Sequence, residues 1–296
     1  MRAGDARFVD SRFRARLCSR AVSVTPPEPL PSSTLILLRD EPRGEGPFSV
    51  LMLERHGSIT FPGVHAFPGG IVDPGDSEIV DALLPATQTW AARGEGDTPD
   101  DALPYWVAAV RELFEEMGIL LAIRDGRLVD GPLDGALVDL RRRLLGGEPF
   151  NALLAERALV PATDALHYFA RWITPRMNPK RFDTRFLVGR VPPGQDAVAD
   201  GTETVGHEWL TPTAALGAYQ DGRIQLIPPT VRTLDDLARF ASVDEVLADA
   251  SRRVVRALCP EIESGGAEPS MRYPDNTGAG LPPRRLVLRN GRWRPE

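Results

Sequence analysis

One short stretch, Arg111 to Ile119, constrains the fold and chemistry of this chain more than any other. Its letters are RELFEEMGI. With about 3.6 residues per turn, Glu112, Glu115 and Glu116 fall on one side of a helix, and the apolar residues between them can face a core. Gly118 is suited to end that helix in a left-handed conformation. The segment therefore predicts the end of a helix that presents three carboxylates on one face.

Three neighbouring carboxylates repel one another unless a cation neutralises them. A hard divalent ion such as Mg²⁺ prefers oxygen ligands, and it can bind substrate phosphates at the same time. The other interpretation is a solvated helix face on which Arg111 pairs with Glu115 at i,i+4. This stretch alone leaves both interpretations open.

A second segment, FPGGIVDPGD at residues 67–76, supports the metal interpretation. Together the two segments resemble the Nudix hydrolase box, whose second half is matched at every defined position from Arg111 to Ile119. The chain departs from the box at Asp76, where the family pattern has Glu. It departs again at residues 77–110, a much longer spacer than the family usually has, so an insertion splits the box.

The resemblance implies an enzyme with an α/β Nudix fold, in which a mixed β-sheet is sandwiched between helices. It implies that Glu112, Glu115 and Glu116 hold Mg²⁺ or Mn²⁺, and that this metal ion promotes hydrolysis of a pyrophosphate. Arg111 is expected to orient carboxylates such as Glu112 or Asp76. The candidate for a further metal ligand or catalytic base is Glu203, with Glu208 behind it. Gly69 and Gly70 would let the backbone approach metal or phosphate closely.

A narrower resemblance concerns the substrate. LMLER at residues 51–55, Pro62-Gly63 and the FPGG segment look like the coenzyme A diphosphatase branch of the Nudix family. That likeness implies hydrolysis of CoA or acyl-CoA to 3′,5′-ADP and 4′-phosphopantetheine or its acyl form, with Arg55 binding substrate. The alternatives are a Nudix pyrophosphatase for ADP-ribose, NADH or another nucleotide, and a catalytically silent Nudix-like binding domain.

Arg185 is a further candidate for substrate binding. A strand over residues 181–188 would place Arg181 and Arg185 on one face, where both guanidinium groups could receive phosphates. Asp183 lies on the same face and could instead pair with either arginine. An ion pair between Asp183 and one of these arginines is slightly favoured over phosphate binding.

The chain is expected to have three parts. Residues 1–28 form an Arg-rich flexible tail, residues 29–258 the Nudix domain, and residues 259–296 an extension that covers the domain or builds a homodimer contact. Two helical insertions are expected, at about 77–104 and 130–160. The first could contact an acyl chain or pantetheine, or could simply decorate the surface.

Hydrophobic patterning predicts the remaining elements. Strands are expected at 34–38, 48–53, 119–123, 167–174 and 181–188, and helices at 137–145, 153–159, 230–240 and 243–258. Residues 260–283 are expected to be a loop, and residues 285–293 a hairpin with an Asn-Gly turn.

Composition excludes several classes of function. The net charge of −6 argues against a general nucleic-acid binder, and no apolar run approaches the roughly 20 residues that span a bilayer. Cys18 and Cys259 are too few for a disulfide framework, which favours a reducing cytoplasm. Lys180 is the single lysine among 35 basic residues, a bias that indicates GC-rich coding and a bacterial source. The expected partner is a small nucleotide substrate.

Overall fold

The structure is a computed structural model that describes residues 26–41, 47–55, 63–78, 94, 97–263, 268–274 and 284–296. Several predictions fall outside these residues. They concern most of the N-terminal tail, Cys18, Pro62, and residues 79–93 and 95–96 of the first insertion. They stay predictions.

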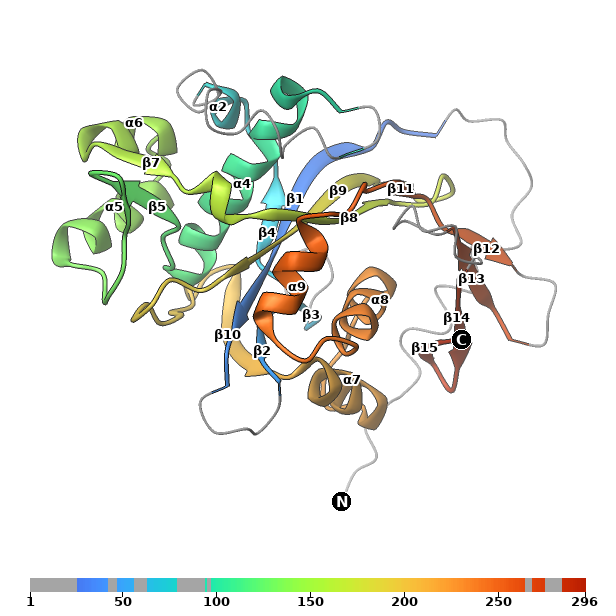
Figure 1. The fold of residues 1–296 in the computed structure, drawn as a ribbon. Helices are drawn as coiled ribbons and strands as arrows, with labels where there is room; N and C mark the ends of the chain where they lie inside the picture. Colours follow the sequence, from blue (N-terminus) through green and yellow to red (C-terminus); the bar gives the residue numbers. More distant parts are fainter. Residues whose placement is uncertain are drawn as a thin grey trace.

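A mixed eight-stranded sheet forms the centre of the molecule (Figure 1). Its main path runs β10-β2-β1-β9-β8-β11, with β3 paired to β2 and β4 paired to β1. Strand β1 is parallel to β9 and antiparallel to β2 and β4. The strands are β1 (Leu30–Arg39), β2 (Ser49–Arg55), β3 (His65–Ala66), β4 (Gly69–Ile71), β8 (His167–Ile173), β9 (Phe182–Arg190), β10 (Thr204–Leu210) and β11 (Ala257–Leu258).

Helices cover both faces of this sheet, as predicted (Figure 1). Alternate residues of β1 point to opposite faces, so Leu35 and Leu37 join one buried cluster and Ile36 and Leu38 the other. The first cluster is shared with helices α4 (Pro99–Met117), α5 (Gly135–Leu145) and α6 (Phe150–Glu156). The second is shared with α7 (Pro212–Asp221), α8 (Pro228–Leu237) and α9 (Val243–Ala250). A strand buried on both faces explains why residues 34–38 form a continuous apolar run.

Helix α4 is the helix expected from the Arg111–Ile119 stretch. Thr98 caps its N-terminus by accepting a hydrogen bond from the Asp101 amide at 3.3 Å. Its apolar stripe packs fully buried under the sheet at Leu103, Trp106, Val107, Val110 and Leu113. Gly118 ends the helix with φ 65°, the predicted left-handed cap.

The chain after Gly118 differs from the expected strand at 119–123. Only β5 (Ala122–Arg124) forms there, in a small sheet with β6 (Arg127–Leu128) and β7 (Leu159–Pro161). The backbone of Leu120 bonds instead to the side chain of Gln195, whose Oε1 accepts at 2.8 Å and whose Nε2 donates at 3.1 Å. A buried amide side chain therefore replaces a strand partner, and pattern alone gives no sign of it.

Several predicted helices end earlier than expected. The helix predicted at 153–159 is α6, which ends at Glu156 because Ala158 takes φ 50° and Leu159 starts β7. The helix predicted at 243–258 ends at Ala250, since Leu258 belongs to β11, which pairs with β8. Short helix α2 (Pro74–Ser77) and a 3₁₀ turn (Thr163–Ala165) complete the helical elements among the described residues.

The C-terminal extension forms a four-stranded sheet rather than a loop and a hairpin alone. It contains β12 (Glu261–Glu263), β13 (Ser270–Tyr273), β14 (Arg284–Arg289) and β15 (Arg292–Pro295), so the prediction of a loop over 260–283 was wrong in part. The Asn-Gly turn is confirmed, with φ 51° at Asn290 and 74° at Gly291. The amide of Trp293 donates to the hydroxyl of Tyr219 on α7 at 2.8 Å, so the extension covers the domain. A homodimer contact stays a prediction.

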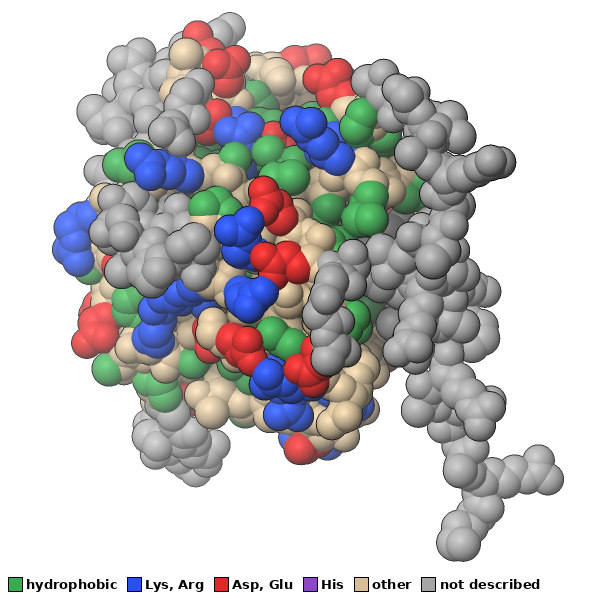
Figure 2. All heavy atoms as spheres, turned by 90° about the vertical axis from the view of Figure 1, so that its right-hand side faces the viewer, with side chains coloured by type: hydrophobic (Ala, Val, Ile, Leu, Met, Phe, Trp, Pro, Cys, Tyr) green, Lys and Arg blue, Asp and Glu red, His purple; other side chains and the backbone are tan. Residues whose placement is uncertain are grey.

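The outer side of the C-terminal sheet carries interleaved charges of both signs (Figure 2). Arg272 pairs with Glu261 at 2.7 Å and with Glu263 at 3.2 Å, and Arg289 pairs with Glu268 at 2.7 Å. The coloured side chains of this face therefore form no broad basic patch of the kind that binds a nucleic-acid backbone. Within the described residues, no helix combines the length and apolar character needed to cross a membrane.

Candidate active site

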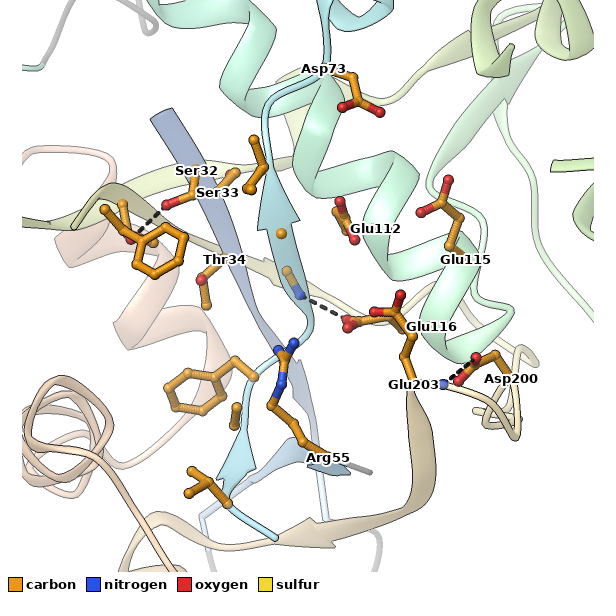
Figure 3. Close-up of a pocket in the computed structure, with 18 of the residues that line it drawn as sticks. Ser32, Ser33, Thr34, Arg55, Asp73, Glu112, Glu115, Glu116, Asp200 and Glu203 are labelled. Atoms are coloured by element: carbon orange, nitrogen blue, oxygen red, sulfur yellow. Dashed lines mark hydrogen bonds between the residues drawn. The ribbon is translucent and has the colours of Figure 1, made fainter. Parts of the chain in front are cut away.

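A pocket of about 560 Å³ lies where β4 runs between helix α4 and the start of β1 (Figure 3). Seven of the nine predicted site residues line it: Arg55, Gly69, Gly70, Glu112, Glu115, Glu116 and Glu203. The other two, Arg111 and Arg185, do not line it. The fold thus brings the Gly-Gly segment against the carboxylate helix although an insertion separates them in sequence.

Arg111 lies behind the carboxylates and connects them. Its guanidinium holds buried Asp76 with two hydrogen bonds, from Nε at 2.9 Å and from Nη2 at 3.0 Å. Its Nη1 donates to Glu112 at 2.8 Å and to Glu115 at 3.2 Å. The predicted contacts to Glu112 and Asp76 are therefore present. The i,i+4 pair with Glu115 also forms, but on a wall of the pocket rather than on an open helix face.

Asp76 has a structural position that explains why an aspartate can stand there. Its side chain accepts a hydrogen bond from the Asp73 amide at 2.8 Å within the capping box of α2, and only 1% of the residue is exposed. The shorter side chain reaches Arg111 from this turn. Asp76 thus fixes Arg111, and Arg111 in turn positions Glu112 and Glu115.

The two glycines of β4 are needed for different reasons. Gly69 donates its amide hydrogen to Glu116 at 2.9 Å and has φ 154°. A Cβ there would lie 2.3 Å from the carbonyl oxygen of Ser33 on β1. A Cβ on Gly70 would instead lie 2.3 Å from Oε1 of Glu112. Gly69 therefore permits strand pairing, and Gly70 leaves room for a site carboxylate.

Replacing Gly70 with alanine is expected to lower turnover roughly 10- to 100-fold, because it displaces the Glu112 carboxylate from its position. The fold should persist, since the end of a side chain can move where backbone cannot. The measurement is steady-state hydrolysis together with the melting temperature. Gly75→Ala is the matched control, because its Cβ would meet nothing within 4 Å. Equal turnover in the two variants would contradict this role of Gly70.

The positive charges of Arg111 and Arg55 compensate the carboxylates of the pocket only in part. Burial raises the pKa of Glu115 to about 7, and the neighbouring charge of Glu112 adds to the effect. Burial raises the pKa of Glu112 and, still more, that of Glu116. Hydrogen bonds from Arg111 and Gly69 oppose these shifts without cancelling them. Binding of a cation therefore stabilises a carboxylate cluster of this kind.

The donor set fits a hard divalent cation. Glutamate oxygens are ligands that Mg²⁺ and Mn²⁺ accept. Among the described residues, no three His, Cys, Asp or Glu side chains already form a group that could hold a metal ion. Mg²⁺ commonly binds through one or two carboxylates, keeping waters and substrate phosphates as its other ligands. Glu112, Glu115 and Glu116 could supply those carboxylates.

The raised pKa of Glu115 gives a pH prediction for the metal-free protein. The group ionises near pH 4.5 as a free side chain and near pH 7 in the folded protein. Between these values the folded state binds more protons, so the contribution of Glu115 to stability falls as pH rises. In chelator, Glu115→Gln should therefore gain stability relative to wild type from pH 4.5 to pH 7, measured by urea unfolding. Exposed Glu208→Gln is the control, and a gain that does not change with pH would contradict the prediction.

Glu203 reaches the pocket from a loop built around Asp200 (Figure 3). Asp200 accepts hydrogen bonds from the amides of Glu203 and Thr204, each at 2.9 Å. Burial tends to raise the pKa of Asp200, but these bonds and those from Thr202 outweigh it and lower the pKa. The charge of Glu203 contributes to the raised pKa of Glu112 and Glu116. The loop thus holds a fourth glutamate near the three of α4.

Glu208 and His207 lie farther along β10, and neither lines the pocket. Glu208 is exposed, and His207 is half-buried in the strand. Glu203 is therefore the better-placed of the two acidic candidates for a base.

Arg55 extends from the end of β2 toward Glu116 (Figure 3). Its charge lowers the pKa of Glu116, although less than burial raises it. Its Nε is buried and has no hydrogen-bond partner among the described residues. An unsatisfied donor of this kind is suited to an oxygen atom of a ligand.

Arg185 lies away from the pocket, contrary to the expectation that it binds substrate. It pairs with Asp97 at 2.9 Å, and its guanidinium stacks 3.7 Å from the ring centroid of Tyr105. Arg181 donates to the carbonyl oxygens of Thr174 and Pro27, and Asp183 pairs with Arg171 at 2.7 Å. The expected pairing of Asp183 with Arg181 or Arg185 was therefore wrong. Each of these three side chains instead contacts a group outside residues 181–188.

Sequence reasoning missed part of the pocket wall. Thr184 and Phe186 of β9 line the pocket, as do Phe182 and Lys180. The period-two spacing of 182, 184 and 186 is the signal that could have placed them on one face. Asp200 was also missed, and the Asp-Gly-Thr turn that it starts gives no hint that Glu203 beside it lines the pocket.

Comparison with known proteins agrees with this geometry. Residues 83–239, a little over half of the chain, match the family model described as NUDT19 Nudix domain. The chain is 30% identical over 243 residues to the human protein named acyl-coenzyme A diphosphatase NUDT19. The matched region covers 69% of this chain and 64% of that protein. The Gallus gallus protein of the same name is 27% identical over 256 residues, covering 72% and 67%. This chain thus spans slightly less than two thirds of the human relative.

A solved structure gives the same result for the fold. The crystal structure of a Nudix hydrolase from Alicyclobacillus acidocaldarius has a TM-score of 0.63 to this chain at 27% identity. The match covers 75% of this chain and 96% of that one. The divided box, the sandwiched sheet and these matches lead to one conclusion: the chain belongs to the Nudix hydrolase family, and within it resembles the coenzyme A diphosphatase branch.

Proposed function

We propose that this protein is a pyrophosphohydrolase that cleaves CoA or acyl-CoA to 3′,5′-ADP and 4′-phosphopantetheine or its acyl form. The observation that carries the proposal is the placement of Glu112, Glu115 and Glu116 on one pocket wall beside Arg55 and the Gly69-Gly70 strand. The names of the human and Gallus gallus relatives support the choice of substrate. In the reaction, water adds across one phosphoanhydride bond. Its oxygen joins one phosphorus, and a proton goes to the departing phosphate.

Membership of the Nudix family implies a divalent metal ion, and we propose Mg²⁺ or Mn²⁺ here, held by Glu112, Glu115 and Glu116. Such an ion would neutralise the pyrophosphate charge and lower the pKa of a bound water.

The chain itself contributes positioning and charge. Arg111 keeps Glu112 and Glu115 oriented, and the Gly69 amide holds Glu116. The Arg55 guanidinium is available to a phosphate oxygen, where it would form a charge-assisted hydrogen bond. Glu203 is available to accept the proton from the attacking water. Most of the acceleration would come from orientation and electrostatics rather than from a covalent intermediate.

The test is product analysis by mass spectrometry. The purified protein is incubated with Mg²⁺, and separately with Mn²⁺, together with CoA, several acyl-CoAs, NADH, ADP-ribose and diadenosine polyphosphates. The proposal expects 3′,5′-ADP to appear from CoA or acyl-CoA. Cleavage of NADH or ADP-ribose alone would keep the Nudix chemistry and reject the CoA assignment. No cleavage at all would reject the enzymatic proposal in favour of a binding domain.

A further inference from the structure

The charges of the pocket are segregated. All six carboxylates that line it belong to helix α4 or lie close to it: Asp73, Glu112, Glu115, Glu116, Asp200 and Glu203. Asp73 lies 3.8 Å from Arg111, and the amide of Asp200 donates to the Glu116 carbonyl at 3.0 Å. Glu203 is close enough to raise the pKa of Glu112 and Glu116. This part of the pocket is called the carboxylate end.

The other part of the pocket lies on the opposite face of the sheet. Phe186 belongs to the buried cluster shared with α7, α8 and α9, so Phe182 and Thr184, spaced by two along β9, face the same side. On β1, Ser32 and Thr34 pair with Thr184 and Phe186 in register. These five residues, with Phe67 and Lys180, are called the sheet-face end. The pocket therefore passes from one face of the sheet to the other around the short strand β4.

The sheet-face end combines aromatic rings with hydroxyl groups. Phe67 and Phe186 make an edge-to-face contact, with ring centroids 6.4 Å apart. The hydroxyls of Ser32 and Thr184 are hydrogen-bonded to each other at 2.7 Å. Such surfaces suit a nucleoside, whose base has an apolar face and whose sugar carries hydroxyls.

Lys180 provides the charge at this end. It is the only lysine in the chain, whereas the other 34 of the 35 basic residues are arginines. Its ammonium lies 5.1 Å from the ring centroid of Phe182, a contact that helps to hold it. Among the described residues, Lys180 has no ion-pair partner, and none of the pocket carboxylates lies at the sheet-face end.

The backbone that presents Lys180 is anchored on both sides. Thr174 and Phe182 close the β8–β9 connection, with the Thr174 amide donating to the Phe182 carbonyl at 2.9 Å. The side chain of Arg181 donates to the carbonyl oxygens of Thr174 and Pro27. The Lys180 residue is exposed, but the backbone that carries it is held in place. It can therefore act as a positioned point charge for an anion.

We propose that Lys180 is a specificity-determining residue that binds a phosphate monoester carried by the nucleoside part of the substrate. This phosphate is distinct from the pyrophosphate, which lies at the carboxylate end. The inference rests on the proposed function, in which CoA carries such a group as its 3′-phosphate. The charge segregation supports it, since a second phosphate placed at the carboxylate end would be repelled. At the sheet-face end it meets Lys180, for which the described part of the chain offers no ion-pair partner.

The first test uses CoA and 3′-dephospho-CoA as paired substrates. Lys180→Ala is expected to lower kcat/KM for CoA about 10-fold, mainly through KM, because a charge-assisted hydrogen bond is lost. It should change kcat/KM for 3′-dephospho-CoA by less than about twofold, because that substrate lacks the group. Lys180→Arg should restore most of the preference for CoA. Arg176→Ala, an exposed position in the same connection that does not line the pocket, is the control.

The second test does not depend on turnover. Calorimetric titration compares 3′,5′-ADP with 5′-AMP, which differ only in the 3′-phosphate. Wild type should bind 3′,5′-ADP more tightly, and Lys180→Ala should bind the two equally, with an unchanged melting temperature. Equal affinities in wild type, or a preference that survives Lys180→Ala, would overturn the inference. Failure of the proposed function would show differently, as CoA that stays intact by mass spectrometry.

Discussion

Replacing Glu116 with glutamine is expected to lower turnover by at least about 100-fold, because it removes one negative ligand from the proposed metal site. The amide oxygen of glutamine can still accept the hydrogen bond from Gly69, which is 2.9 Å long in the structure. The residue is 5% exposed, and burial raises the pKa of its carboxyl well above the usual value. Loss of that buried charge should leave the metal-free fold as stable as wild type or more stable. Turnover and urea unfolding in chelator measure the two effects.

Asp100→Asn is the matched control for this substitution. Asp100 lies in the first turn of the same helix, but it is exposed and does not line the pocket. It should retain turnover close to that of wild type. A Glu116→Gln protein as active as Asp100→Asn would remove Glu116 from the metal site. A loss of turnover accompanied by unfolding would show that Glu116 acts through the fold instead.

Replacing Arg111 with methionine is expected to destabilise the protein by about 3–5 kcal/mol, because it leaves the Asp76 carboxylate buried without its partner. Arg111 is 5% exposed and Asp76 1% exposed, and two hydrogen bonds join them. Arg111 also donates to the Ile71 carbonyl on β4 at 2.9 Å. Its loss therefore loosens both the α2 turn and the Gly-Gly strand. The measurement is the free energy of unfolding in urea.

A double-mutant cycle separates the effect of the Arg111–Asp76 ion pair on stability from the role of Arg111 in orienting Glu112 and Glu115. Asp76→Leu in the Arg111→Met background removes the orphaned charge and should recover part of the lost stability. Glu112 and Glu115 would still lack their orienting donor, so turnover should stay low in the double variant. Equal stability of Arg111→Met and wild type would contradict the network. Turnover restored in the double variant would contradict the positioning role of Arg111.

The sequence was a good guide wherever local chemistry determined structure. The Gly118 end of α4 and the Asn290-Gly291 turn both form as predicted. In each case the short-range preference and the tertiary packing agree, so neither overrides the other. The apolar run over residues 34–38 likewise forms a central strand. A strand buried on both faces is apolar at consecutive positions, so it is easily recognised in the sequence.

The predictions that failed depended on partners distant in sequence. Residues 119–121 are fully buried and apolar, yet the side chain of Gln195 occupies the backbone amide and carbonyl of Leu120. Strand spacing places Asp183 beside Arg181 and Arg185, but Asp183 pairs instead with Arg171 of the neighbouring strand β8. No periodicity within a segment encodes which side chain arrives from another element.

By itself, the sequence determined the family, the carboxylate helix and the glycines beside it, because these depend on residue types at fixed local spacings. Only the tertiary structure decided which other residues share the pocket. It brought Glu203 to the carboxylates through the Asp200 turn, and it turned Arg185 inward to Asp97. It also brought Lys180 and the aromatic rings of β9 into the same pocket. The physical reason is that strand order and register, which join segments far apart in the chain, decide which side chains meet across the sheet.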